Sequence, residues 1–150
     1  MHENQQSFTI SKYQKLARIG KGGFGTVYKV EEKATKKIYA GKIIDIDNED
    51  DLRKKIIDIY REVNILSSLN HPAILKFIEY SPKFFRNANG AIETSAIIIT
   101  EYAKNNSLKT MLNLERTQKS PREWTDTKKL INLYGISVAM SFLHKYNILH

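Results

Sequence analysis

The sequence contains no cysteine, only three prolines and no long hydrophobic run. Without cysteine there is no disulfide framework and no thiolate chemistry. The longest purely aliphatic stretch, residues 96–99, is far too short to span a membrane, and the N-terminus lacks an apolar signal region. No set of Cys and His has metal-ligand spacing. We therefore expect a cytoplasmic protein with no membrane partner and no metal site of its own.

Basic residues outnumber acidic ones, which gives a formal net charge of +8. Such a charge could indicate a nucleic-acid or membrane-surface partner. The basic excess is spread over the whole chain, however, and the densest like-charged cluster, residues 45–51, is acidic. We interpret the charge as solvated surface and expect no nucleic-acid partner. A basic RNA-binding domain is the least favoured of three functional hypotheses.

Hydrophobic periodicity predicts an α+β chain. Runs rich in β-branched and aromatic residues predict five strands, over residues 13–20, 26–32, 38–46, 74–80 and 95–102. Helical spacing predicts a helix at about 50–69, which Asn70-His71-Pro72 ends. Two further helices are expected, over residues 108–114 and 127–146. The last is apolar around most of its circumference, which predicts burial on several sides. The change of pattern predicts two lobes joined near residue 103.

The most informative stretch is the glycine-rich run from Gly20 to Gly25. Glycines let backbone N–H groups approach phosphate oxygens closely and accept positive φ. Alone, the G-x-G-x-x-G spacing leaves two other interpretations, a flexible hairpin turn and a dinucleotide-binding fold, for which Asp45 is suitably spaced. The dinucleotide fold needs a helix directly after the glycines. Residues 26–30 have the pattern of a strand, which argues against that fold.

With the residues that follow, this stretch resembles the protein kinase family. In that family the loop is followed by a valine after one residue and by a strand-borne lysine in an A-x-K context. The sequence has Gly25-Thr26-Val27 and then Ala40-Gly41-Lys42. The resemblance implies that Lys42 contacts the α- and β-phosphates of ATP. It also implies nucleotide contacts from the loop residues Gly20, Lys21, Gly22, Gly23, Phe24 and Gly25.

A carboxylate, Glu62, falls inside the apolar stripe of the helix predicted over residues 50–69. A buried carboxylate is costly unless it has a cation, so by itself Glu62 is interpreted as a stripe-edge residue that reaches solvent. The resemblance matches it instead to the helix-C glutamate that orients the phosphate-binding lysine. The Lys42–Glu62 pair would then support catalysis and act as a switch, made or broken by movement of the helix.

The run from Ile97 to Ala103 resembles the last strand of the kinase small lobe leading into the hinge. The resemblance implies that Thr100 is the gatekeeper, and that the Glu101 carbonyl and the Ala103 amide face adenine. It further implies that Ile19, Val27 and Ala40 form apolar walls of the adenine site. Ser107 would lie near the ribose. The apolar residues can also be ordinary strand core, and both interpretations can be true together.

The resemblance covers residues 13–150. It divides the chain into an N-terminal extension over residues 1–12, a small lobe with its hinge over 13–103, and an incomplete start of the large lobe over 104–150. His150 fits the first residue of the H-R-D signature of the catalytic loop. The catalytic aspartate and the Mg²⁺ ligands of the family would follow it. Mg²⁺ is therefore an expected cofactor with no ligand in this chain, and the 150 residues alone are expected to be inactive.

The leading hypothesis is the ATP-binding part of a serine/threonine protein kinase, which transfers the γ-phosphate of ATP to protein substrates. The Thr100 gatekeeper and the E-Y-x-x-N-x-S-L hinge most resemble the tyrosine-kinase-like group of serine/threonine kinases. The alternative is a pseudokinase or regulatory nucleotide-binding module without phosphoryl transfer. Two spacings depart from compact members of the family. The acidic segment before the first helix and the connection from Ser81 to Thr94 are long, and we interpret both as loop insertions, the second turning at residues 87–90.

Overall fold

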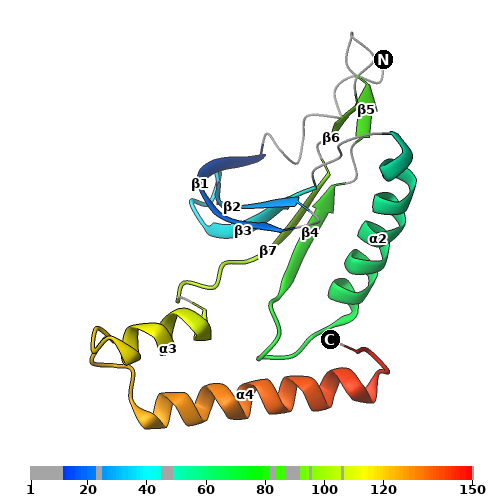
Figure 1. Ribbon diagram of the computed structural model, residues 1–150. Coiled ribbons are helices and arrows are strands. Elements are labelled where there is room, and N and C mark those ends of the chain that lie inside the picture. The colour runs from blue at the N-terminus through cyan, green and yellow to red at the C-terminus, as the bar shows by residue number, and fades with distance from the viewer. Residues whose placement is uncertain are drawn as a thin grey trace. The chain divides into compact units, whose positions relative to one another are not determined.

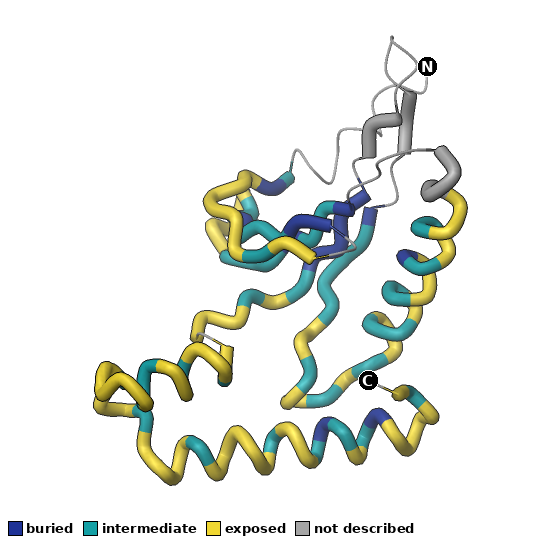
Figure 2. Tube along the Cα trace, in the orientation of Figure 1, coloured by how far each residue is buried: buried dark blue, intermediate teal, exposed yellow. Residues whose placement is uncertain are grey.

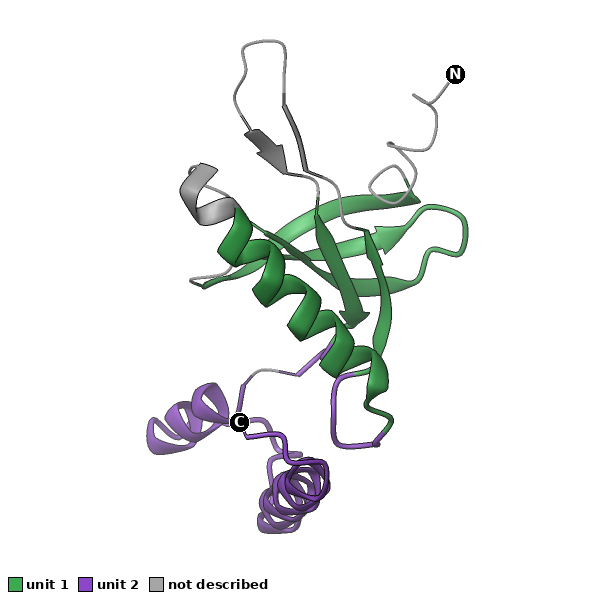
Figure 3. Cartoon of the chain, turned by 90° about the vertical axis from the view of Figure 1, so that its right-hand side faces the viewer, with its two compact units in different colours: residues 1–70, 76–102 green, residues 71–75, 103–150 purple. Residues whose placement is uncertain are grey.

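The structure is a computed structural model that describes residues 12–22, 25–44, 49–81, 84–86, 92–94, 96–105 and 107–149. The chain separates by its internal contacts into two units, which Figure 3 colours differently. The first unit holds residues 1–70 and 76–102, and the second holds residues 71–75 and 103–150. The chain therefore passes from one unit to the other three times. The domain boundaries expected from the sequence stay a prediction.

The first unit is built on a five-stranded antiparallel sheet with the strand order β1-β2-β3-β7-β4 (Figure 1). The strands are β1 (Tyr13–Gly22), β2 (Gly25–Glu32), β3 (Ile38–Ile43), β4 (Phe77–Ser81) and β7 (Ile97–Glu101). The first three form a meander of neighbouring antiparallel strands, and β7 then lies between β3 and β4. The predicted α+β class and five-stranded sheet are confirmed.

Each face of the sheet has its own buried cluster. One face gathers Tyr13, Val30, Ile97 and Ile99, and the other gathers Ile44, Ala96 and Ile98 with Ile59 of helix α2 (Glu49–Ser68). Residues 97–99 of β7 are all at most 2% exposed and alternate between the two clusters. Burial of one such side chain contributes about 1.5–3 kcal/mol to the free energy of unfolding, so β7 stabilises the buried clusters on both faces of the sheet. Figure 2 shows this concentration of buried residues in the sheet.

Helix α2 lies along the second face of the sheet, where Ile59 packs with Val63 and Leu66 at helical spacing (Figures 1 and 3). Its bounds, Glu49–Ser68, agree with the predicted helix to within one residue at each end. The helix ends before Pro72, as expected from the restriction that proline places on the preceding residue.

The structure corrects several predicted strand boundaries. Strand β1 runs on to Gly22 and β2 begins at Gly25, so the glycines at the two ends of the loop belong to strands. Strand β4 begins at Phe77 rather than Ile74, because the Ile74 N–H donates to the His71 carbonyl (3.0 Å) in a turn. Strand β3 ends at Ile43, and residues 45–48 lie outside the described residues.

The connection from Ser81 to Thr94 was predicted as a loop, and this was wrong. It contains a second, two-stranded sheet in which β5 (Phe84–Arg86) pairs antiparallel with β6 (Ile92–Thr94). Three-residue strands are too short to show an alternating pattern, which is why the sequence did not distinguish them from a loop. The turn expected at residues 87–90 lies outside the described residues.

The second unit contains helices α3 (Leu108–Arg116) and α4 (Asp126–Lys145). Helix α3 continues two residues past its predicted end, since Glu115 and Arg116 are both good helix formers. Thr125 caps α4 by accepting the Lys128 N–H (3.3 Å). Among the described helices, none combines the length and the apolar character that crossing a bilayer requires.

The prediction that α4 is buried on several sides was wrong for the described part of the chain. Only Ala139 and Leu143 are buried, while Leu130 and Tyr134 are 68% and 70% exposed. Within this unit the neighbours of α4 include residues 71–75, where the His71 ring lies 4.9 Å from the Phe142 ring. The apolar circumference of α4 therefore remains largely exposed, as the yellow stretches in Figure 2 show.

Candidate functional site

The centre of the candidate site is an ion pair between the sheet and helix α2. The Lys42 Nζ atom on β3 lies 2.8 Å from one carboxylate oxygen of Glu62 and 2.7 Å from the other. The Lys42 side chain is 24% exposed and that of Glu62 is 36% exposed. A half-buried ammonium held at a fixed point by a carboxylate can bind the oxygens of an anionic ligand.

The strand register places Lys42 beside other predicted site residues. Val27 on β2 is directly opposite Lys42, and Ala40 on β3 is directly opposite Thr100 on β7. Opposed residues of an antiparallel pair project to the same face, as do residues two apart along one strand. The four side chains therefore lie on the face that α2 packs against, and they combine two small apolar residues with a cation and a hydroxyl.

The paired ends of β1 and β2 at Gly20, Gly22 and Gly25, here called the glycine hairpin, lie next to these four side chains. Gly20 is opposite Val27 and Gly22 is opposite Gly25. Gly25 has φ +143°, and a Cβ on it would lie 2.1 Å from the Ile43 carbonyl oxygen, so only glycine fits there. A Cβ on Gly22 would meet nothing within 4 Å. The hairpin is thus tightly fixed at Gly25 and has open space at Gly22, which suits the close approach of a phosphate.

The remaining loop residues of the predicted set are less informative. Lys21 is exposed at the end of β1, and Ile19, predicted as an apolar wall, is 47% exposed. Gly23 and Phe24 lie outside the described residues. The same holds for His150, whose predicted place at the start of a catalytic loop stays a prediction.

Two hydrogen bonds fix Glu101 at the end of β7. Its backbone N–H donates to the Lys76 carbonyl (2.9 Å), and its carboxylate accepts the Lys76 N–H (2.9 Å). The Thr100 hydroxyl donates to the Glu101 carbonyl (3.3 Å). The kinase resemblance implies a role for Glu101 only through its carbonyl. The side-chain contact spans 25 residues of sequence, and only the pairing of β4 with β7 could have indicated it.

Ala103 and Ser107 belong to the second unit. The Ser107 hydroxyl accepts the Thr110 N–H (3.2 Å) and caps helix α3. Its position in front of a helix signals this role in the sequence. The ribose contact that the resemblance implies for Ser107 stays a prediction, as do the nucleotide contacts of the other predicted residues.

A network at the start of β1 is structural rather than part of this site. Lys12 Nζ lies 3.0 Å from the Glu32 carboxylate on β2 and 3.4 Å from that of Glu79 on β4. The Thr35 hydroxyl, and then Lys12, hold the pKa of Glu32 below its usual value. Glu32 in turn raises the pKa of Lys12. The network therefore joins three strands of the sheet through charges that persist near neutral pH.

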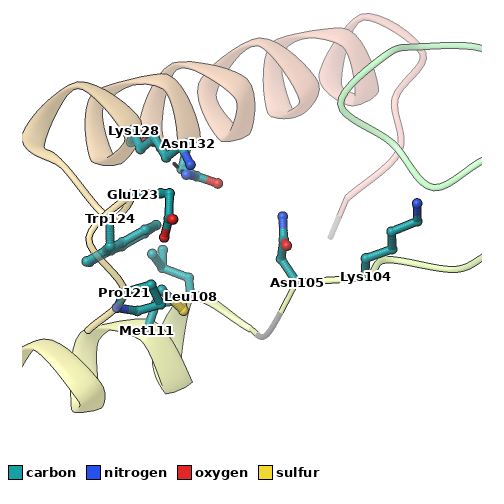
Figure 4. A pocket seen from close by; sticks show the side chains of 9 residues that line it. All are labelled: Lys104, Asn105, Leu108, Met111, Pro121, Glu123, Trp124, Lys128 and Asn132. Carbon is teal, nitrogen blue, oxygen red and sulfur yellow. Dashed lines mark hydrogen bonds between the residues drawn. The ribbon is translucent and has the colours of Figure 1, made fainter. Parts of the chain in front are cut away.

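The second unit has a pocket of about 450 Å³, which no pattern in the sequence indicated (Figure 4). Leu108 and Met111 of α3 and Trp124 give it an apolar side, and Lys128 and Asn132 of α4 add polar groups. The Trp124 indole N–H donates to the Glu115 carboxylate (3.2 Å), which holds the ring in place. The pocket can take an apolar group with a polar end. The described parts of the chain contain no cluster of three or more His, Cys, Asp or Glu able to hold a metal ion.

Comparison with known proteins identifies the family. Residues 13–150 match the protein kinase domain. The chain is 26% identical over 139 residues to the probable serine/threonine-protein kinase nek1 of Dictyostelium discoideum. It is 30% identical over 141 residues to cyclin-dependent kinase-like 4 of Mus musculus, and 30% identical over 150 residues to Aurora kinase B of the same species.

These alignments cover 93%, 94% and 99% of this chain, but only 26%, 36% and 38% of the respective relatives. The chain thus spans between about a quarter and two fifths of the length of these proteins. The family match, in contrast, covers nearly all of the chain and includes the glycine hairpin, the Lys42–Glu62 pair and the end of β7. The chain therefore belongs to the protein kinase domain family.

Proposed function

We propose that this chain binds ATP and is the nucleotide-binding part of a kinase that transfers the γ-phosphate of ATP to serine or threonine of protein substrates. The observation that carries the proposal is the Lys42–Glu62 ion pair, on the same face of the sheet as Val27 and beside the glycine hairpin. Family membership and relatives named as serine/threonine kinases support it.

Each residue has a distinct part in binding. The Lys42 ammonium is a compact positive charge for the phosphate oxygens, and Glu62 restricts where that charge lies. Gly22 leaves room for a phosphate next to the hairpin backbone. Val27 and Ala40 offer a small apolar surface that suits the flat adenine ring.

Bound ATP supplies the transferable phosphoryl group, with Mg²⁺ on its phosphates. We assign no Mg²⁺ ligand to the described residues. The chemistry of transfer is proposed to need residues other than these 150, so the 150-residue chain alone should bind nucleotide weakly and show no turnover.

Two finer points rest on the hinge residues. Thr100 and the run from Glu101 to Leu108 support the tyrosine-kinase-like group of serine/threonine kinases, and the exposed position of Glu101 at the end of β7 fits a hinge strand.

The alternative function, a pseudokinase or regulatory nucleotide-binding module, uses the same site without transfer. It predicts ATP binding and no phosphorylated product.

The test uses the complete kinase of which these 150 residues are proposed to be a part, and compares it with its Lys42→Met variant and with Lys36→Met, a matched control whose side chain is 70% exposed. Mg·ATP binding is measured by titration calorimetry, and transfer of labelled γ-phosphate is measured on peptides with Ser, Thr or Tyr acceptors. We expect Lys42→Met to weaken ATP binding and abolish transfer to Ser and Thr, and Lys36→Met to change neither.

Each other result has a defined meaning. ATP binding without transfer in the wild type would establish the pseudokinase alternative. Transfer to Tyr alone would contradict the proposed acceptor. Tight RNA binding with no nucleotide binding would overturn the proposal as a whole.

A further inference from the structure

We propose that the carboxylate of Glu101 is a positioning group for the nucleotide site, because it holds the backbone of Lys76 and so fixes the strand end that presents the Glu101 carbonyl. The inference rests on the proposed function, since it concerns the adenine end of the ATP site. It gives the side chain a role that is separate from the backbone contact implied by the kinase resemblance.

The geometry is a reciprocal pair of hydrogen bonds. The Glu101 N–H donates to the Lys76 carbonyl, and the Lys76 N–H donates to the Glu101 Oε1 atom, both at 2.9 Å. In a regular antiparallel pair the second bond would end on a backbone carbonyl. Here a carboxylate oxygen takes that place, which makes the bond charge-assisted and stronger than a neutral one.

The contact lies at an irregular part of the pairing between β4 and β7. The pairing of β4 with β7 continues from Phe77 opposite Thr100, and its register shifts between Phe77 and Glu79. A shift of this kind interrupts the ladder locally. Glu101 therefore supplies an added bond at the irregular end of β4.

The contact joins two residues that lie near boundaries of the first unit. Lys76 is the residue with which the chain re-enters the first unit, and Glu101 is the second-last residue before the chain leaves that unit at Tyr102. The two bonds thus hold together, inside the first unit, the segment that enters it at Lys76 and the segment that leaves it after Tyr102. They also restrict the backbone of Glu101, whose carbonyl accepts from the Thr100 hydroxyl and has a second lone pair for a ligand.

A backbone fixed before binding loses less conformational entropy when the ligand arrives. The contact is exposed, so its effect on stability should be small. Its loss should weaken binding of the adenine end while leaving the phosphate end unchanged. Glutamine keeps an oxygen acceptor at the same distance, so Glu101→Gln should preserve the contact, whereas Glu101→Ala removes it.

The experiment measures binding of ATP and of inorganic tripolyphosphate to the complete kinase proposed above and to its Glu101→Ala, Glu101→Gln and Glu31→Ala variants. Glu31→Ala is the matched control, because it removes a partly exposed carboxylate of the same sheet (23% exposed) that pairs with Lys36 (3.2 Å). Amide hydrogen exchange of Lys76 is followed in parallel, since it reports the contact without any nucleotide.

We expect Glu101→Ala to weaken ATP binding about 5- to 10-fold, in line with the loss of one solvent-accessible hydrogen bond, and to speed Lys76 exchange by a similar factor. Tripolyphosphate binding should stay at the wild-type value. Glu31→Ala should behave as wild type in all three measurements, whereas Glu101→Gln, which keeps a neutral acceptor, should lie between wild type and Glu101→Ala for ATP binding and for Lys76 exchange.

Unchanged ATP affinity in Glu101→Ala, equal weakening of both ligands, or unchanged Lys76 exchange would each overturn the positioning role while leaving the proposed function intact. So would a Glu101→Gln variant that behaves as Glu101→Ala. A wild-type chain that binds no ATP would contradict the proposed function itself, and the positioning role with it.

Discussion

The Lys42 ammonium contacts both carboxylate oxygens of Glu62, at 2.8 and 2.7 Å, and so joins strand β3 to helix α2. Both side chains keep access to solvent, at 24% and 36% exposure. Water screens such a pair, so its contribution to folding is small even though its geometry is good. We therefore expect the pair to matter more for the proposed nucleotide binding than for the stability of the fold.

A double-mutant cycle separates these two effects. With Lys42→Met, Glu62→Gln and the double variant, we expect a coupling free energy of about 0.5–1 kcal/mol in urea unfolding, as for other solvent-accessible pairs. Glu62→Gln should weaken ATP binding by the complete kinase although Lys42 is intact. A coupling well above 3 kcal/mol would show a deeply buried pair and contradict this interpretation.

The glycine hairpin gives a second prediction, with its own control. Gly25→Ala would place a Cβ 2.1 Å from the Ile43 carbonyl and at φ +143°, so we expect a loss of about 2 kcal/mol or more in the free energy of unfolding. Gly22→Ala meets nothing within 4 Å and should change it by less than about 0.5 kcal/mol. Urea unfolding of both variants checks this, and equal effects would show that position 25 is not constrained.

The Tyr80 side chain on β4 packs against Tyr60, and its hydroxyl is buried with no hydrogen-bond partner among the described residues. An unpaired buried hydroxyl is destabilising, so Tyr80→Phe should raise the free energy of unfolding by up to about 1 kcal/mol. Tyr134→Phe, at a residue that is 70% exposed, should leave it unchanged. A clear loss of stability in Tyr80→Phe would show that the hydroxyl has a partner.

The same residue predicts a pH dependence. Burial raises the pKa of Tyr80 from 10.0 to about 12, so the folded protein keeps this proton where the unfolded chain releases it. The free energy of unfolding does not depend on this group below pH 10, and it falls as the pH rises from 10 through about 12. Between these values, wild type should lose more stability than Tyr80→Phe. Parallel curves for the two proteins would contradict the shift.

An ion pair in the second unit predicts a titration at low pH. The Lys129 ammonium contacts the Glu115 carboxylate and holds the pKa of Glu115 below its usual value of 4.5. The pair therefore contributes stability above that value, and the contribution is lost as the pH falls through the lowered pKa. In Lys129→Met we expect Glu115 to titrate nearer 4.5. Carboxyl carbon chemical shifts measure this, with Lys128→Met as the control.

The architecture and the central ion pair could be predicted because each depends on local pattern. The glycines of the hairpin, the lysine on β3 and the apolar spacing of α2 identify their elements one at a time, and the order of the motifs then brings Lys42 and Glu62 together. The predicted helix 50–69 differs from α2 by a single residue at each end.

Other features depend on contacts that local pattern does not encode. The carboxylate of Glu101 bonds to Lys76 only because β4 and β7 pair. The pair β5–β6 has strands too short for any period, and α4 looks buried by composition while Leu130 and Tyr134 are exposed. In each case the missing information was which segments become neighbours in space.

The place of β7 between β3 and β4 also determines when the site can form. Strand β3 joins β2 through a short turn, but its other edge pairs with residues 97–101, which are far along the chain. During synthesis from the N-terminus, the glycine hairpin and Lys42 emerge early. One edge of β3 then has no strand to pair with until Ile97–Glu101 has been synthesised. Because pairing β3 with β7 closes a long stretch of chain, we expect this pairing to form later and more slowly than the pairing of β2 with β3. The proposed nucleotide site would thus draw most of its residues from the start of the chain and be completed only when β7 pairs with β3.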